Sequence, residues 1–152
     1  MYKEYLKKFV EEHIELIDTL HIDELYEELS NSDVPVFDYK ELFETLILCN
    51  VDVLKHVNKV HDQMFYEYDE EELRLPQNIT CIGQQAFENS SIQRLYIEGK
   101  LTYVDTWAFS FMNYLKEIHF SQTLDEVRKL LHSFNFLEEN IKIICIDGVT
   151  ES

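Results

Sequence analysis

Glycine and proline are scarce in this 152-residue chain, which contains three glycines and two prolines. Because long flexible or extended linkers depend on these residues, we expect one or two compact units. The three cysteines, Cys49, Cys81 and Cys145, are odd in number and far apart in the sequence. They offer neither a disulfide framework nor a zinc-ligand pair, so we expect free thiols in a reducing compartment.

Basic residues are also few, and this excludes two classes of partner. The chain has 13 lysines and arginines against 30 acidic residues, a formal net charge of −17 at pH 7. Binding to a phosphate backbone or to an anionic membrane needs clustered positive charge, so we expect no direct nucleic-acid or membrane partner. No apolar run approaches the roughly 20 residues that cross a bilayer, and residues 1–10 lack the apolar core of a signal peptide.

The acidic residues that are present are unevenly distributed. Residues 1–72 contain 20 acidic and six basic residues, a net charge of −14. Residues 73–152 contain ten acidic and seven basic residues, a net charge of −3. Such a difference predicts two segments with different roles, which we place at residues 1–72 and 73–148.

The first segment has the apolar spacing of short helices. Near the N-terminus, apolar residues recur every three or four positions, at Tyr2, Tyr5, Leu6, Phe9, Val10, Ile14 and Ile17. A second helix is expected at Asp23–Leu29, with Leu25 and Leu29 facing inward. Residues 30–35 (SNSDVP) predict a loop. None of these helices is long enough to be stable alone, so they must pack on one another or on the second segment.

Two further helices are expected before residue 58. Asp38 is a candidate N-cap for a helix through Leu46, with Glu41 at the capping-box position three residues later. Asn50 is a candidate N-cap for a helix that runs through Val57. The first segment is therefore predicted to be an acidic helical segment.

The second segment contains an internal repeat. Residues 73–87 (LRLPQNITCIGQQAF) align with residues 95–109 (LYIEGKLTYVDTWAF), and a third copy starts at Ile118. The pairs that match at one constant offset are Leu73 and Leu95, Leu75 and Ile97, Ile79 and Leu101, Ile82 and Val104, Ala86 and Ala108, and Phe87 and Phe109. Each copy exposes an apolar face that only a neighbouring copy can cover, which predicts a stacked solenoid.

This pattern resembles the BspA-like subgroup of bacterial leucine-rich repeats. The family unit reads loosely as a strand ending in proline, then I-x-x-I-G-x-x-A-F, a polar turn and a leucine. The residues that carry the resemblance are Leu75-Pro76, Ile79, Ile82-Gly83, Ala86-Phe87 and Ile92. In the second copy Glu98 replaces the proline and Asp105 replaces the glycine.

The resemblance covers residues 73–148 and includes the end of the repeat array. Residues 117–131 resemble a final strand with a short helix, and residues 141–148 resemble a closing strand with an Asp-Gly turn. Together with the helical segment this implies an α+β fold, in which an N-terminal helical cap packs on a short leucine-rich-repeat solenoid with a small parallel sheet.

As a short version of the repeat preceded by an acidic helical segment, the chain also resembles proteins carried by bacteriophages and prophages. This implies a location in the cytoplasm of a bacterial host cell. Whether the chain is of phage or bacterial origin stays open, as does the choice between a monomer and a homodimer.

Alternation along the predicted strands places one column of residues on the open face of the sheet. The members of this column are Arg74, Tyr96, His119 and Ile144, which lie between inward-facing apolar residues. Arginine and tyrosine are frequent anchors of protein interfaces. The alternative interpretation is an ordinary solvated surface.

We find no constellation of residues that indicates catalysis. The six histidines are scattered, no His-Glu-x-x-His motif is present, and three glycines cannot form a phosphate-binding loop. We therefore expect a protein that is not an enzyme and that uses neither a cofactor nor a metal ion. Trp107 lies in the small-aromatic stretch of the second copy and is expected to pack in the core.

Two hypotheses of function follow, and both make the chain a protein-binding module. In the first, a phage-encoded inhibitor mimics nucleic acid and blocks a basic nucleic-acid-binding host or defence protein. Its candidate contact residues are Glu11, Glu12, Glu15, Asp18, Glu24, Glu27 and Glu28. In the second, a scaffold or assembly adaptor binds through the sheet face at Arg74, Tyr96 and His119. The alternative to the first is that the acidic face only keeps the protein soluble.

Overall fold

The computed structural model divides into two compact units, Met1–Val57 and Asn58–Ser152. It describes residues 4, 8–9, 11–12, 22–31, 41–42, 46, 53–55, 57–133 and 136–152. Eleven of the residues named above lie outside the described residues, as does most of the predicted loop at residues 30–35: Tyr2, Tyr5, Leu6, Val10, Ile14, Glu15, Ile17, Asp18, Asp38, Cys49 and Asn50.

The first unit is helical at almost every residue that the structure describes. Helix α3 spans Ile22–Ser30, and a 3₁₀ turn spans Val53–Lys55. The other helical residues are Glu4, Lys8, Phe9, Glu11, Glu12, Glu41, Leu42 and Leu46. Leu25 and Leu29 are buried one turn apart on α3, which confirms the inward face predicted from their spacing.

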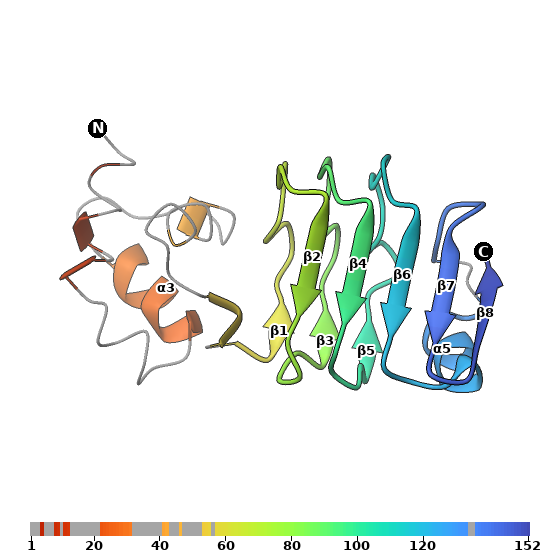
Figure 1. Cartoon of the computed structure of the whole chain (residues 1–152). Helices are drawn as coiled ribbons and strands as arrows, with labels where there is room; N and C mark the ends of the chain where they lie inside the picture. The colour runs from red at the N-terminus through yellow and green to blue at the C-terminus, as the bar shows by residue number, and fades with distance from the viewer. Residues whose placement is uncertain are drawn as a thin grey trace. The chain divides into compact units, whose positions relative to one another are not determined.

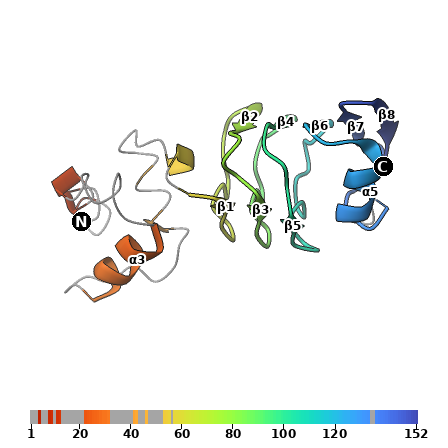
Figure 2. The same cartoon turned by 90° about the horizontal axis from the view of Figure 1, so that it is seen from below.

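The second unit is a β-solenoid of four coils (Figure 1). One face is a five-stranded sheet in the order β2 (Glu72–Leu75), β4 (Arg94–Ile97), β6 (Glu117–Phe120), β7 (Lys142–Cys145) and β8 (Gly148–Glu151). The opposite face is a three-stranded sheet of β1 (Lys59–Val60), β3 (Cys81–Ile82) and β5 (Tyr103–Val104). Seen from below, the two sheets form two rows of strands (Figure 2).

The strand register confirms the repeat. Leu73 pairs with Leu95, which pairs with Ile118, which pairs with Ile143, all in parallel. All four side chains are buried. The offset between the copies in the sequence is therefore the length of one coil, so that each inward residue lies directly beside its counterpart in the next coil.

The solenoid begins earlier than the sequence indicated. Strand β1 of the first coil pairs with β3 of the second coil. Residues 58–72 therefore belong to the solenoid and not to the helical segment. In this coil Met64 and Phe65 occupy the positions of Ala86 and Phe87. Because a methionine replaces the alanine, the first coil lacks the Ala-Phe pair that marks the later coils. The predicted boundary therefore falls at Glu72, inside the first strand of the five-stranded sheet.

This boundary also changes the distribution of charge. Residues 1–57 contain 14 acidic and five basic residues, a net charge of −9, and residues 58–152 contain 16 acidic and eight basic residues, a net charge of −8. The acidic run at residues 67–72 belongs to the solenoid. The helical unit is more densely charged, but both units are acidic.

A ladder of phenylalanines explains the Ala-Phe signature. Phe65, Phe87 and Phe109 stack across three coils, with ring centroids 5.9 and 6.2 Å apart and interplanar angles of 18° and 9°. All three are at most 5% exposed. Ala86 and Ala108 beside the ladder are completely buried. Three identical rings in register therefore fill the interior of neighbouring coils in the same way.

The glycine position of the family pattern is occupied differently in the second and third coils. At Gly83 a Cβ atom would lie 3.0 Å from the carbonyl oxygen of Val60 and would collide with the carboxylate of Asp62. That carboxylate accepts a hydrogen bond from the Gln84 amide at 2.8 Å. In the next coil Asp105 takes the glycine position, and its own carboxylate accepts from the Trp107 amide at 2.9 Å.

The expectation that Trp107 packs in the core is wrong. Its side chain is 60% exposed, whereas the two residues that follow it, Ala108 and Phe109, point inward. Trp107 is the counterpart of Gln85, which directly precedes the Ala-Phe pair of the second coil. The position before this pair is therefore exposed in the third coil and half-buried in the second.

Helix α5 (Leu124–Leu130) occupies the place that a fourth short strand would take (Figure 2). Thr123 caps it by accepting from the Glu126 amide at 3.2 Å, as expected for a Thr-x-x-Glu capping box. The Asp147 carboxylate also accepts from the Leu124 amide at 2.8 Å. The predicted final strand, helix and closing strand are confirmed, and β8 is an additional strand that pairs antiparallel with β7.

A buried glutamine compensates for the missing strand. The side-chain amide of Gln122 accepts from the Leu101 N–H at 3.0 Å and donates to the Leu101 carbonyl at 3.1 Å. Gln122 is only 5% exposed. Its amide therefore satisfies two backbone groups next to β5 that no neighbouring strand can satisfy.

We predict that Gln122→Leu destabilises the chain by about 3 kcal/mol, because it leaves both Leu101 groups buried without a partner. Urea unfolding should show a lower midpoint with an unchanged slope. Gln77→Leu is the matched control, since Gln77 is exposed, and it should change stability by less than about 0.5 kcal/mol. Equal stability of the Gln122 variant and the wild type would contradict the role of this amide.

Candidate functional site

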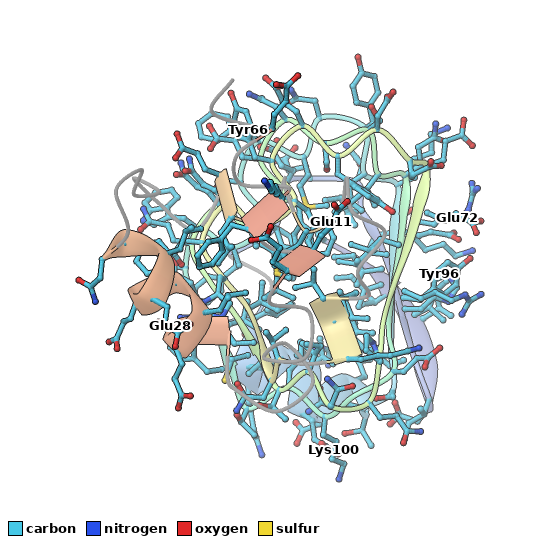
Figure 3. The ribbon with its side chains drawn as sticks, turned by 90° about the vertical axis from the view of Figure 1, so that its left-hand side faces the viewer. Glu11, Glu28, Tyr66, Glu72, Tyr96 and Lys100 are labelled. Carbon is cyan, nitrogen blue, oxygen red and sulfur yellow. The ribbon has the colours of Figure 1, made fainter. Side chains whose placement is uncertain are left out.

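The outer face of the five-stranded sheet carries one continuous column of side chains. Arg74 pairs with Tyr96, Tyr96 with His119, His119 with Ile144, and Ile144 with Val149. The first four are the column predicted from alternation. Val149 was missed because β8 turns back on β7 in a hairpin, which the repeat does not contain. In Figure 3, Tyr96 points away from the coils on the same side as Glu72.

The first three side chains of this column are stacked on one another. The Arg74 guanidinium carbon lies 4.0 Å from the centre of the Tyr96 ring. The rings of Tyr96 and His119 are 4.4 Å apart, with an interplanar angle of 24°. Cation–π and ring stacking hold all three side chains in fixed orientations. Little side-chain entropy is then left to lose when a partner binds.

A second row of alternating charge runs beside the column. Its members pair in register across the sheet: Glu72, Arg94, Glu117, Lys142 and Glu151. Charges of opposite sign directly across neighbouring strands stabilise a sheet. The first four members lie at the same offsets as the repeat, so the offsets applied to polar positions would have revealed them, whereas Glu151 lies on the closing hairpin outside the repeat.

Hydrogen bonds favour the charged forms of two members of the row. Arg94 donates to Glu72 at 2.7 Å, and this bond raises the pKa of the guanidinium. His119 donates to the Glu117 carboxylate at 3.0 Å, and this bond lowers the pKa of Glu117. A guanidinium nitrogen of Arg74 also lies 3.8 Å from a carboxylate oxygen of Glu98. Arg94 and Glu117 therefore stay charged at neutral pH.

The predicted acidic surface is exposed wherever the structure describes it. Glu11, Glu12, Glu24, Glu27 and Glu28 are all exposed, and the last three lie on α3. Figure 3 shows Glu28 on this helix. The ammonium nitrogen of Lys8 lies 4.0 Å from a carboxylate oxygen of Glu12, which follows it by one helical turn. Glu15 and Asp18 lie outside the described residues.

The described residues contain no arrangement that would bind a metal ion: none of their His, Cys, Asp and Glu side chains form a group of three or more with suitable placement. Cys81 and Cys145 are free thiols. Burial, followed by the nearby Asp147, raises the pKa of Cys145, which favours an unreactive thiol. Among the described helices none is long and apolar enough to span a bilayer.

Comparison with known families identifies the repeats. The profile of the BspA type leucine-rich repeat region matches residues 39–150 with six copies. No curated protein and no solved structure matches the chain. The match includes the first coil and the closing hairpin, and it covers more than half of the sequence. The chain belongs to the BspA-type leucine-rich repeat family.

Proposed function

We propose that this chain is a protein-binding module whose contact surface is the column Arg74, Tyr96, His119, Ile144 and Val149. The repeat architecture of the family is that of a protein-interaction module. The observation that carries the proposal is the stack of Arg74, Tyr96 and His119, in which two residue types common at interface hot spots are held rigidly on an open sheet.

The form of this face supports a macromolecular partner. The column crosses all five strands of the sheet and passes from a cation through two rings to two aliphatic side chains. A flat, mixed surface of this kind suits a protein, because small molecules are held in enclosed, mostly apolar cavities. The alternating charges beside the column would select a partner with the complementary pattern.

We predict that Tyr96→Ala weakens binding of the natural partner by about 30-fold, as expected for loss of a hot-spot residue worth about 2 kcal/mol. The partner would be captured from a bacterial lysate, and its affinity measured by titration calorimetry. Tyr66→Ala is the control, since Tyr66 lies away from the sheet face that carries Tyr96 (Figure 3). Unchanged affinity in the Tyr96 variant would rule out this face.

The acidic helical unit supports a second candidate function. We propose, as this second candidate, that the chain is a phage-encoded inhibitor. It would occupy the basic surface of a nucleic-acid-binding host or defence protein with the carboxylates of Glu11, Glu12, Glu15, Asp18, Glu24, Glu27 and Glu28. The exposure of the described members favours this candidate, because exposed carboxylates attract a cationic partner over a distance of about 10 Å.

If the acidic surface makes the contact, Glu27→Lys together with Glu28→Lys will slow association with a captured partner by at least about tenfold and flatten its dependence on salt. The matched control is Glu138→Lys with Glu139→Lys, an adjacent exposed pair on the solenoid that changes the net charge equally. Stopped-flow kinetics at low and physiological salt make the comparison. If both double variants slow association equally, net charge alone is responsible.

We also propose that the helical unit caps the first coil. No strand within the described residues precedes β1 or β2 in its sheet, and the terminal repeats of a solenoid need a cover. A fragment of residues 58–152 should therefore self-associate or lose its cooperative thermal transition, as followed by sedimentation and circular dichroism. A monomeric fragment that melts at the temperature of the full chain would contradict the cap.

A further inference from the structure

The third coil carries a row of exposed aromatic side chains on its outer surface. Tyr103, Trp107, Phe111 and Tyr114 are 55%, 60%, 51% and 61% exposed. They follow one another along a single coil, from β5 through the turn that precedes β6. Since an aromatic side chain has roughly 200 Å² of surface, the four together expose on the order of 450 Å², spread along the coil. Exposed tryptophan and tyrosine side chains are frequent anchors of interaction sites.

The same four positions are not aromatic in the preceding coils. Their counterparts are Lys59, Gln63, Glu67 and Asp69 in the first coil, and Cys81, Gln85, Asn89 and Ser91 in the second. The fold is therefore built without aromatic residues at these positions. The core of the third coil is filled by Ala108, Phe109 and the other inward residues, which leaves the aromatic row without a packing role.

Hydrogen bonds hold the backbone beneath this row of side chains in place. The Asp105 carboxylate accepts from the Trp107 amide at 2.9 Å and from the Tyr103 hydroxyl at 3.4 Å. The carbonyl of Phe111 accepts from the Asn89 amide of the preceding coil at 2.9 Å. The solenoid thus holds the backbone that carries the row in place, and none of the four residues belongs to the column of Arg74, Tyr96 and His119.

The charges around the row indicate what it binds. Between Lys100 and Lys116 the one charged residue is Asp105. A hollow of about 310 Å³ beside Tyr114 is lined by Asp69, Glu71, Ser91 and Gln93. Glu71 is paired with Arg94 at 3.8 Å, which leaves Asp69 as the carboxylate of this hollow without a basic partner among the described residues. At the other end, a groove of about 470 Å³ next to Tyr103 contains Glu126, Lys129 and His132, and Lys129 is paired with Asp125 at 3.1 Å.

We propose that this aromatic row is a second docking surface, and that its occupant is a protein segment rich in arginine or lysine. A guanidinium or ammonium group binds over the face of a tryptophan or tyrosine ring, and nearby carboxylates strengthen the attraction. The net charge of −17 on the whole chain draws a cationic segment toward the surface. Arginine stacks on such rings better than lysine, because its guanidinium is planar.

The test uses intrinsic fluorescence of the full chain, because Trp107 is the only tryptophan in the sequence and lies in the middle of the row. The probe is a nine-residue oligoarginine peptide, titrated at physiological salt. We expect a saturable change in Trp107 emission, with about fivefold weaker binding of an oligolysine peptide of equal length. Phe111→Ser with Tyr114→Ser should weaken the oligoarginine affinity about tenfold, as expected for the loss of two cation–π contacts.

Two controls show whether the row itself binds the peptide. Ile146→Ser, at an exposed apolar residue that belongs to neither the row nor the column, should leave the oligoarginine affinity unchanged. Circular dichroism of each variant should match the wild type. Equal weakening by Ile146→Ser and by the double variant, or no effect of the double variant, would overturn the proposal. A proline-rich peptide that binds more tightly than oligoarginine would also overturn it, as would self-association of the chain that the double variant abolishes.

Discussion

The stacking of one coil on the next is the constraint on which the rest of the solenoid depends. A single coil has an apolar interior but too little of it to fold alone, so every coil needs a neighbour in strict register. The Phe65, Phe87 and Phe109 ladder supplies that register in the interior, and the parallel strand pairs supply it at the surface. Because of this register, residues that lie one repeat apart in the sequence become neighbours in space.

This register determines where functional side chains can lie. It aligns Arg74, Tyr96 and His119 into one stack and aligns five charged residues into a row of alternating sign beside it. Away from this sheet it leaves the outer surface of the third coil free to carry four aromatic residues in place of polar ones. The solenoid thus presents two different surfaces, each built by substitution at positions that the core does not use.

Much of the solenoid was predictable from the sequence, because repeated apolar positions report coil length directly. The inward strand residues and four members of the open-face column were predicted correctly from the repeat, and the terminal helix was predicted from the family resemblance. The first coil was missed, since Met64 stands where Ala86 and Ala108 stand later. Strand β8 was missed because an antiparallel hairpin lies outside the repeat. The exposure of Trp107 was missed because an aromatic residue next to the buried Ala-Phe pair was expected to be buried as well. The distribution of charge changed with the boundary, because the run at residues 67–72 belongs to the solenoid.

If the outer face of the five-stranded sheet is the contact surface, a bound partner must shield it from solvent. Hydroxyl-radical footprinting of the full chain, with and without a captured partner, tests this directly, because the reactivity of each side chain reports its exposure. Binding should protect Tyr96, His119 and Ile144, while Tyr66, which lies away from this face, keeps its reactivity. Unchanged reactivity of Tyr96 and His119 in the saturated complex would contradict the assignment of this face.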